Sequence, residues 1–182
     1  MLLWLNGPFG VGKTTTSTLL RHARPDVRVF DPELVGYLLR RLIPEPVDDF
    51  QDWPAWRVLV AETAAVLWKH YGALVVAPMS LLREDYATEI FTRLRRRGVP
   101  QLHVVLHAEP ATLAQRIRND TVETGAVQWR LDSLPRYQSA LRWLQREAIL
   151  IDTTHLTKAE VAAAVDAVLP RTAGVDGPQD QA

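Results

Sequence analysis

The chain has 182 residues, of which 47% are hydrophobic and 23% are charged, with 21 basic side chains, 21 acidic side chains and no cysteine. This length suits one compact domain with a sizeable core, since a chain of roughly 150 residues buries about 70% of its unfolded surface. The lack of cysteine excludes disulfides, thiolate zinc sites and cysteine nucleophiles. The formal net charge of +0 argues against a nucleic-acid-binding protein that relies on a general attraction for phosphates.

Short apolar runs alternate with longer segments of helical period, which is typical of an α/β fold with a parallel sheet. Strands are predicted at Leu2–Asn6, Val27–Phe30, Ala73–Ala77, Gln101–His107 and Ala148–Ile151. Helices are predicted at about 12–23, 33–42, 55–70, 83–96, 110–118, 129–146 and 158–168. We therefore expect a five-stranded parallel sheet with helices on both faces.

No linker divides residues 1–169, so we interpret them as a single domain. The polar, glycine-containing segment 119–128 lies between two predicted helices and is a candidate mobile lid. Residues 170–182 hold almost nothing to bury and predict a disordered tail.

No apolar run approaches the roughly 20 residues that span a bilayer, and the opening MLLWLNG lacks the features of a secretory signal. We expect a cytoplasmic protein that neither inserts stably into a membrane nor binds nucleic acid. No motif indicates an oligomeric state.

Residues 7–14 read GPFGVGKT and match G-x-x-x-x-G-K-[ST] without exception, between a predicted strand and a predicted helix. The glycines allow successive N–H groups to curl toward phosphate oxygens, and the helix presents its positive N-terminal end to the same anion. Lys13 can reach the β- and γ-phosphates, and the Thr14 hydroxyl can join a magnesium shell. The alternative is a glycine-rich turn without a ligand. The predicted nucleotide-binding residues of this segment are Gly7, Gly10, Val11, Gly12, Lys13, Thr14 and Thr15.

The loop predicts a nucleoside triphosphate site and leaves the reaction open. The motifs N-K-x-D and D-x-x-G, which a GTPase would need, are missing from the sequence. The third predicted strand has no aspartate at its end, which makes a motor or signalling ATPase less favoured. The class that remains is the small kinases, with ATP or GTP as the donor and Mg²⁺ as the cofactor.

Asp31 directly follows the second predicted strand, at the edge of the sheet where ligands bind. Its carboxylate can accept a hydroxyl proton or help to hold Mg²⁺ through water, which makes it a candidate base and, with Thr14, a candidate metal ligand. The alternative is helix capping, because Pro32 follows at the start of a predicted helix. Glu33 is interpreted as a first-turn acid that suits the helix dipole.

Four arginines flank the candidate lid: Arg116, Arg118, Arg130 and Arg136. Closure of this segment over a triphosphate would bring guanidinium groups onto the developing charge. We interpret Arg116 and Arg136 as catalytic residues, with Arg116 also at the nucleotide, and leave Arg118 and Arg130 open. The alternative is solvated helix faces with ordinary ion pairs.

Aromatic and arginine side chains gather between the second and third strands, at Tyr37, Arg40 and the segment DDFQDWPAWR at 48–57. This mixture suits a ligand with a flat ring and anionic or hydroxyl-rich parts. For Trp53 and Trp56 the alternative is that each fills the core around Pro54.

The segments LLWLNGPFGVGKT, VFDPELVGYLLR, DDFQDWPAWR and VVAPMS together resemble the tunicamycin resistance protein family and the related capuramycin phosphotransferases. The resemblance covers most of residues 1–145, with distinctive motifs in the first 80 residues and weak similarity around the lid. It implies a P-loop kinase fold, donor contacts from Lys13 and Thr14, and Asp31 as the base. It also implies an acceptor wall that contains Arg40, Trp56, Arg57, Met79 and Ser80.

We therefore expect a three-layer P-loop kinase that phosphorylates a hydroxyl of a capuramycin- or tunicamycin-like nucleoside antibiotic and so confers resistance. The alternatives are a housekeeping nucleotide or small-molecule kinase and a protein that binds nucleotide and sequesters the drug without chemistry. The predicted substrate-binding residues are Tyr37, Arg40, Phe50, Trp53, Trp56, Arg57, Met79 and Ser80.

Overall fold

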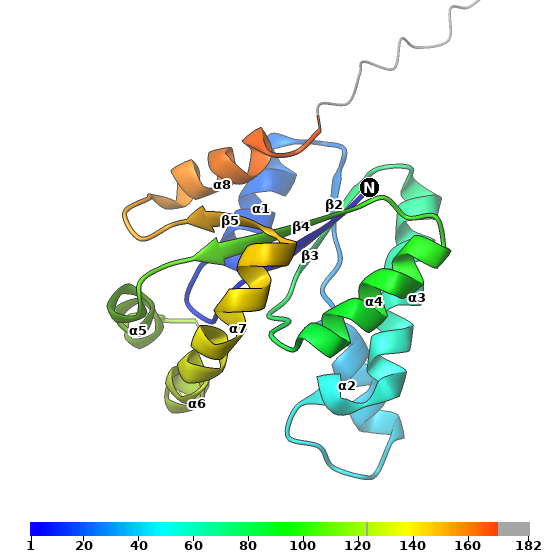
Figure 1. Ribbon diagram of the computed structural model, residues 1–182, viewed down its shortest axis with the longest axis horizontal. Helices are drawn as coiled ribbons and strands as arrows, with labels where there is room; N and C mark the ends of the chain where they lie inside the picture. Colours follow the sequence, from blue (N-terminus) through cyan, green and yellow to red (C-terminus); the bar gives the residue numbers. More distant parts are fainter. Residues whose placement is uncertain (123, 171–182) are drawn as a thin grey trace, which may run out of the picture.

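The computed structural model describes residues 1–122 and 124–170, and a five-stranded parallel sheet forms its centre (Figure 1). The strands are β1 (Leu2–Asn6), β2 (Val27–Val29), β3 (Leu74–Pro78), β4 (Gln101–His107) and β5 (Ile149–Asp152), in the order β2-β3-β1-β4-β5. The predicted strands are confirmed, and their ends differ from the prediction by at most one residue. The central strand β1 is completely buried from Leu2 to Leu5, as expected for a strand that is covered on both faces.

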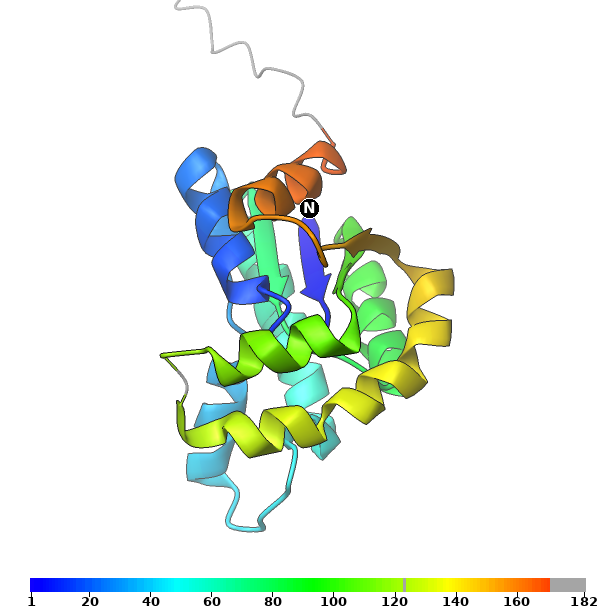
Figure 2. The same cartoon turned by 90° about the vertical axis from the view of Figure 1, so that its left-hand side faces the viewer.

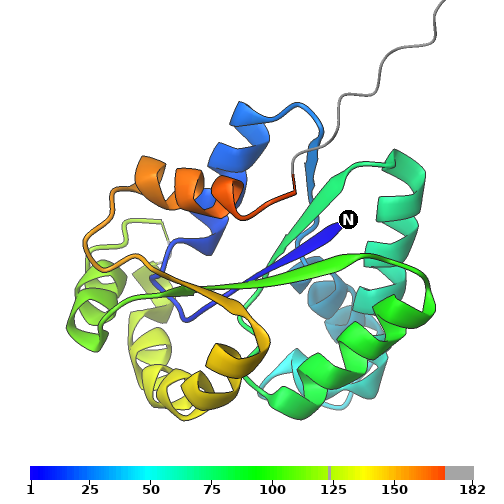
Figure 3. The same ribbon diagram turned by 45° about the horizontal axis from the view of Figure 1, so that its top comes forward.

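Helices cover both faces of this sheet, which confirms the predicted three-layer fold (Figure 3). They are α1 (Lys13–Ala23), α2 (Glu33–Leu42), α3 (Pro54–Tyr71), α4 (Glu84–Arg96), α5 (Pro110–Arg118), α6 (Val127–Asp132), α7 (Leu134–Glu147) and α8 (Lys158–Ala167), with short 3-10 helices η1 (Phe50–Asp52) and η2 (Thr124–Ala126). On one side of the sheet α1 packs against α8, and on the other α3 packs against α4.

The helix predicted over 129–146 is in fact two helices, α6 and α7, which meet at Ser133. Pro135 lies in the first turn of α7, where its missing N–H is tolerated, but it could not continue a helix that had begun at residue 127. The Ser133 hydroxyl donates to the Arg130 carbonyl at 2.6 Å and satisfies one of the last carbonyls of α6. This break is the main difference between the predicted and observed elements.

Figure 2 shows α5 and the α6–α7 pair lying side by side, and the predicted lid joins them. Within that lid Glu123 lies outside the described residues, as do residues 171–182 of the predicted tail. In residues 1–122 and 124–170 no helix combines the length and the apolar character required to cross a bilayer.

Candidate active site

A cleft of about 2090 Å³ opens at the carboxyl ends of the strands. Segments that follow β1, β2, β3 and β5 line it, and α5, α6 and α7 supply further lining residues. In an open parallel sheet this edge is where ligands bind, because loops that leave neighbouring strands in opposite directions leave a crevice between them. The fold therefore gathers most of the residues singled out in the sequence at one place.

The phosphate loop between β1 and α1 owes its shape to glycines with left-handed backbone angles. Gly10 has φ +77° and Gly12 has φ +99°, a region that other residues rarely adopt. Gly7 has φ +137°, and a Cβ on it would lie 2.4 Å from the carbonyl oxygen of Leu106 on β4. The first N–H groups of α1 have no partner within the helix, so they can bind an anion.

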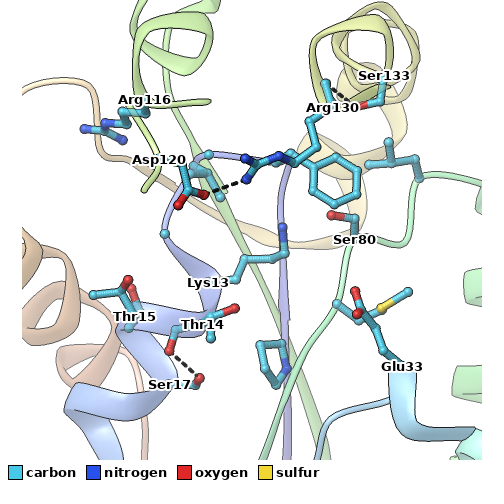
Figure 4. Close-up of a pocket in the computed structure, with 18 of the residues that line it drawn as sticks. Lys13, Thr14, Thr15, Ser17, Glu33, Ser80, Arg116, Asp120, Arg130 and Ser133 are labelled. Atoms are coloured by element: carbon cyan, nitrogen blue, oxygen red, sulfur yellow. Dashed lines mark hydrogen bonds and ion pairs between the residues drawn. The ribbon is translucent and has the colours of Figure 1, made fainter. Parts of the chain in front are cut away.

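All of the nucleotide-binding residues predicted in this segment except Gly7 line the cleft. Gly7 lies beneath the loop, where it is buried. The Nζ atom of Lys13 donates to the carbonyls of Gly7 and Pro8, at 2.8 Å each. It also lies 5.5 Å from the centre of the Phe9 ring. In Figure 4 the Lys13 side chain extends into the middle of the cleft.

Asp31 lines the cleft and also caps α2, because its Oδ1 accepts the backbone N–H of Glu33 at 2.9 Å. Both interpretations of Asp31 from the sequence are therefore compatible with its position. Glu33, interpreted from the sequence as a helix-dipole residue, also reaches the cleft, and Figure 4 shows its carboxylate pointing into it below Ser80. The Tyr37 hydroxyl donates to Glu33 Oε2 at 2.8 Å. A second carboxylate that the sequence analysis did not assign to the site therefore reaches the cleft that the phosphate loop lines.

Three of the four arginines beside the lid line the cleft, and the exception is Arg118. Arg116 is held by Thr153 after β5, with bonds to its hydroxyl at 3.1 Å and to its carbonyl at 2.7 Å. Arg136, at the start of α7, is exposed within the cleft.

Arg130 is the most buried of these arginines, at 3% exposure, and it pairs with Asp120 at 2.6 Å. Figure 4 draws this ion pair above Lys13 and the Glu33 carboxylate at the lower right of the same view. The sequence analysis named Arg130 as a residue that flanks the candidate lid and did not single out Asp120, and their pairing depends on how α5 and α6 pack. No spacing rule would have identified it.

Five of the predicted substrate-binding residues line the cleft: Tyr37, Arg40, Phe50, Met79 and Ser80. The Phe50 ring organises this wall, with the guanidinium of Arg40 at 5.5 Å and the ring of Tyr37 at 6.5 Å from its centre. Gly36 makes this packing possible, because a Cβ there would lie 2.6 Å from the Phe50 ring.

The other three, Trp53, Trp56 and Arg57, do not line the cleft, so the candidate acceptor wall excludes them. Trp56 is fully buried, and its indole N–H donates to the Pro32 carbonyl at 3.1 Å. Trp53 is 9% exposed and belongs to the same core. Core filling, the alternative stated for both tryptophans, fits these positions.

Arg57 is 8% exposed, and its guanidinium donates to one side chain and to backbone carbonyls of η1. Its Nε pairs with Glu89 at 2.6 Å, and its Nη1 donates to the Gln51 carbonyl at 2.6 Å. The guanidinium also lies 4.1 Å from the centre of the Tyr86 ring. These contacts fix η1 against α3 and α4 and leave Arg57 behind the wall.

Asp49 is a cleft carboxylate that the sequence analysis did not single out. Burial raises the pKa of its carboxyl group, an effect opposed by the hydrogen bond from the Gln51 N–H and by the charges of Arg136 and Arg40. The same hydrogen bond, 2.9 Å long, caps η1. Asp49 therefore shares the lining of the cleft with Arg40 on α2 and Arg136 on α7.

The oxygen donors of the cleft suit Mg²⁺. Thr14 offers a hydroxyl and Asp31 a carboxylate, and both line the cleft. Among the described residues, His, Cys, Asp and Glu form no group of three or more that could hold a metal. Mg²⁺ is commonly held by one or two protein oxygens together with substrate phosphates and water, so the residues present fit that ion.

Comparison with a family model and with solved structures agrees with the fold described above. A family model described as an AAA domain matches residues 2–139. The tunicamycin resistance protein of Deinococcus radiodurans is 30% identical, with a TM-score of 0.69 over 91% of this chain and 93% of that chain. A gluconokinase from Sinorhizobium meliloti 1021 is 17% identical, with a TM-score of 0.62 over 88% of this chain and 86% of that chain, which is a likeness of fold alone. A comparison with curated proteins finds no match.

Proposed function

Because the chain belongs to the AAA-domain family and to the tunicamycin resistance protein family, we propose that it is a phosphotransferase that uses a nucleoside triphosphate. The observation that carries this proposal is one cleft that contains both a complete phosphate loop after β1 and the Asp31 carboxylate beyond the end of β2. A kinase needs both a grip on the donor and a group that receives the acceptor's proton.

The proposed acceptor is a hydroxyl of a capuramycin- or tunicamycin-like nucleoside antibiotic. Similarity to the Deinococcus protein supports this class of compound. The wall of Tyr37, Arg40 and Phe50 offers aromatic faces beside a cation, which suits a base attached to a polar sugar. A new phosphate adds roughly 1.5 to 2 negative charges, enough to weaken binding of the drug to a target that fits the unmodified compound.

In the proposed reaction the Asp31 carboxylate orients the acceptor hydroxyl and takes its proton as the oxygen attacks the terminal phosphorus. The bond between that phosphorus and the bridging oxygen breaks, and a nucleoside diphosphate leaves. Lys13 and the N–H groups of the loop stabilise charge on the β- and γ-phosphates. Arg116 and Arg136 line the cleft from α5 and α7 and add positive charge.

Thr14 and Asp31 would hold Mg²⁺, with phosphate oxygens and water completing its shell. When bound, the ion neutralises charge on the β- and γ-phosphate oxygens. The donor can be ATP or GTP in this proposal, because the loop contacts phosphates and not the base.

A test in cells separates this function from its alternatives. A drug-sensitive host that expresses the wild-type chain is expected to survive capuramycin or tunicamycin, and a host that expresses Asp31→Asn is expected to die. Protection that persists with Asp31→Asn, while the purified variant transfers no phosphate, would favour sequestration. Turnover of a metabolite and of no antibiotic would identify a housekeeping kinase.

A further inference from the structure

The buried residue Gly7 connects the phosphate loop to the segment that follows β3. Its carbonyl oxygen accepts the Lys13 amino group at 2.8 Å and the Ser80 hydroxyl at 2.7 Å. A carbonyl oxygen has two lone pairs, so these two donors occupy both of its hydrogen-bond acceptor positions. The Gly7 N–H donates to Asn6 Oδ1 at 2.8 Å. Side chains therefore hold both polar groups of Gly7, and two of the three partners belong to buried residues.

Ser80 is itself fixed in place. It is 9% exposed, and its carbonyl accepts the Gln51 side-chain amide at 2.9 Å. The next residue, Leu81, donates its N–H to Asn6 Oδ1 at 2.8 Å and accepts from Asn6 Nδ2 at 2.7 Å. Hydrogen bonds to the backbone of Ser80 and Leu81 therefore fix the position from which the Ser80 hydroxyl donates to Gly7.

The network continues behind the acceptor wall. Gln51 is 8% exposed, and its carbonyl accepts from Arg57, which pairs with Glu89 on α4. A continuous series of hydrogen bonds therefore runs from α4 through η1 and Ser80 to the carbonyl that Lys13 contacts. Of these groups, the Lys13 amino group is the one that the reaction requires to bind phosphate.

For the nucleotide site of the proposed function, we propose that Ser80 is a positioning residue that holds the Gly7 carbonyl when Lys13 turns to the triphosphate. Charged phosphate oxygens are stronger hydrogen-bond acceptors than neutral carbonyls, so a bound triphosphate draws the amino group away from the loop carbonyls. The Ser80 hydroxyl then keeps the buried Gly7 carbonyl satisfied. This role differs from the contact with the acceptor that the sequence predicts for Ser80, because the Ser80 hydroxyl donates to the phosphate loop.

Ser80→Ala is expected to destabilise the nucleotide complex more than the free protein. Without nucleotide, Ser80→Ala leaves the Gly7 carbonyl with its bond to Lys13, so the free protein loses little. With nucleotide bound, the same variant leaves that carbonyl with no donor from the protein, so the cost falls on the complex. Nucleotide affinity should drop, and Ser80→Thr, which keeps a hydroxyl, should restore it.

The test measures the Kd of a non-hydrolysable ATP analogue with Mg²⁺ by calorimetry, without any acceptor. Failure to phosphorylate an antibiotic would therefore defeat the proposed function and leave this measurement intact. We expect the Kd to rise about tenfold in Ser80→Ala, which is the size of a lost buried hydrogen bond, and to change less than about twofold in Ser80→Thr. The control is Ser139→Ala, which removes a cleft hydroxyl that donates to the Pro135 carbonyl of its own helix, and its Kd should be unchanged.

A melting-temperature cycle on nucleotide-free protein separates this role from a purely structural one. Ser80→Ala should lower the melting temperature much more in a Lys13→Met background than in the wild type, because only the double variant removes both donors from Gly7. Equal losses in the two backgrounds, or an unchanged Kd in Ser80→Ala, would overturn the proposal.

Discussion

Asp31 and Glu33 both line the cleft, but their carboxylate oxygens make different contacts. Asp31 uses one oxygen to cap α2, whereas Glu33 accepts the Tyr37 hydroxyl. The sequence indicated Asp31 through its position after a strand, a signal that depends only on chain order. It did not indicate that Glu33 reaches the cleft, since the direction of a first-turn side chain depends on how α2 packs.

Asp31→Asn should reduce kcat by about a hundredfold or more, in the range reported for loss of a general base. The asparagine oxygen can still cap α2, so the melting temperature should change little, and acceptor binding should persist. The matched control is Glu33→Gln, which keeps the bond from Tyr37 and should lower kcat by less than about tenfold. Steady-state kinetics of both variants checks this assignment. An active Asp31→Asn beside an inactive Glu33→Gln would transfer the role of the base to Glu33.

Lys13→Met should lower kcat by about a hundredfold or more, because it removes a positive charge from the β- and γ-phosphates in the transition state. Folding should persist, since the Gly7 carbonyl keeps its bond to Ser80. Single-turnover kinetics at saturating nucleotide measures the chemical step directly. Wild-type turnover in this variant would remove the lysine from the mechanism.

At the scale of elements, the strands and most helices were predictable because the spacing of apolar residues and the positions of glycine and proline are local properties of the sequence. The break at Ser133 was missed because the helical period continues through it while Pro135 ends the hydrogen-bond ladder. The lining of the cleft was predictable in part. Composition could not separate Phe50, which faces the cleft, from Trp56, which is completely buried a few residues later.

Gly36→Ala tests how α2 and η1 shape that lining. The added methyl group would lie 2.6 Å from the Phe50 ring, which has Trp56 packed at 5.4 Å from its centre. We expect the KM for the acceptor to rise several-fold while nucleotide affinity stays constant. Alanine improves helix propensity by about 1 kcal/mol, and overpacking costs about 1–3 kcal/mol, so stability should fall slightly. An unchanged acceptor KM would show that Phe50 does not shape the site.

At the scale of the whole molecule, β4 carries a partly buried titratable group, His103, whose partner Asn6 lies on β1. His103 Nε2 accepts from Asn6 Nδ2 at 3.1 Å in its neutral form, and burial lowers the pKa of His103 to about 4 from an ordinary value of 6.5. The same Asn6 side chain holds the start of the phosphate loop. Protonation of His103 would therefore disturb the joint between the sheet and the loop.

Between pH 6.5 and about 4 the unfolded chain binds a proton on His103 that the folded chain does not. The stability associated with this residue is therefore complete above pH 6.5 and decreases as the pH falls toward 4, by up to roughly 3 kcal/mol. Urea unfolding of the wild type and of His103→Gln across this range isolates the contribution, because the two proteins differ only in the titratable group at position 103 and share the other four histidines. Parallel pH profiles for the two proteins would contradict the assignment.

The most direct measurement of the whole account is phosphoryl transfer by the purified protein. The protein would be incubated with Mg²⁺ and ATP or GTP together with capuramycin-like and tunicamycin-like compounds, plain nucleosides and sugars, and products would be detected by mass spectrometry and located by phosphorus NMR. The account predicts one phosphoryl group on a hydroxyl of a nucleoside antibiotic, formed by the wild type and not by Asp31→Asn. A protein that binds nucleotide tightly and yields no phosphorylated product from any compound in the set would contradict it.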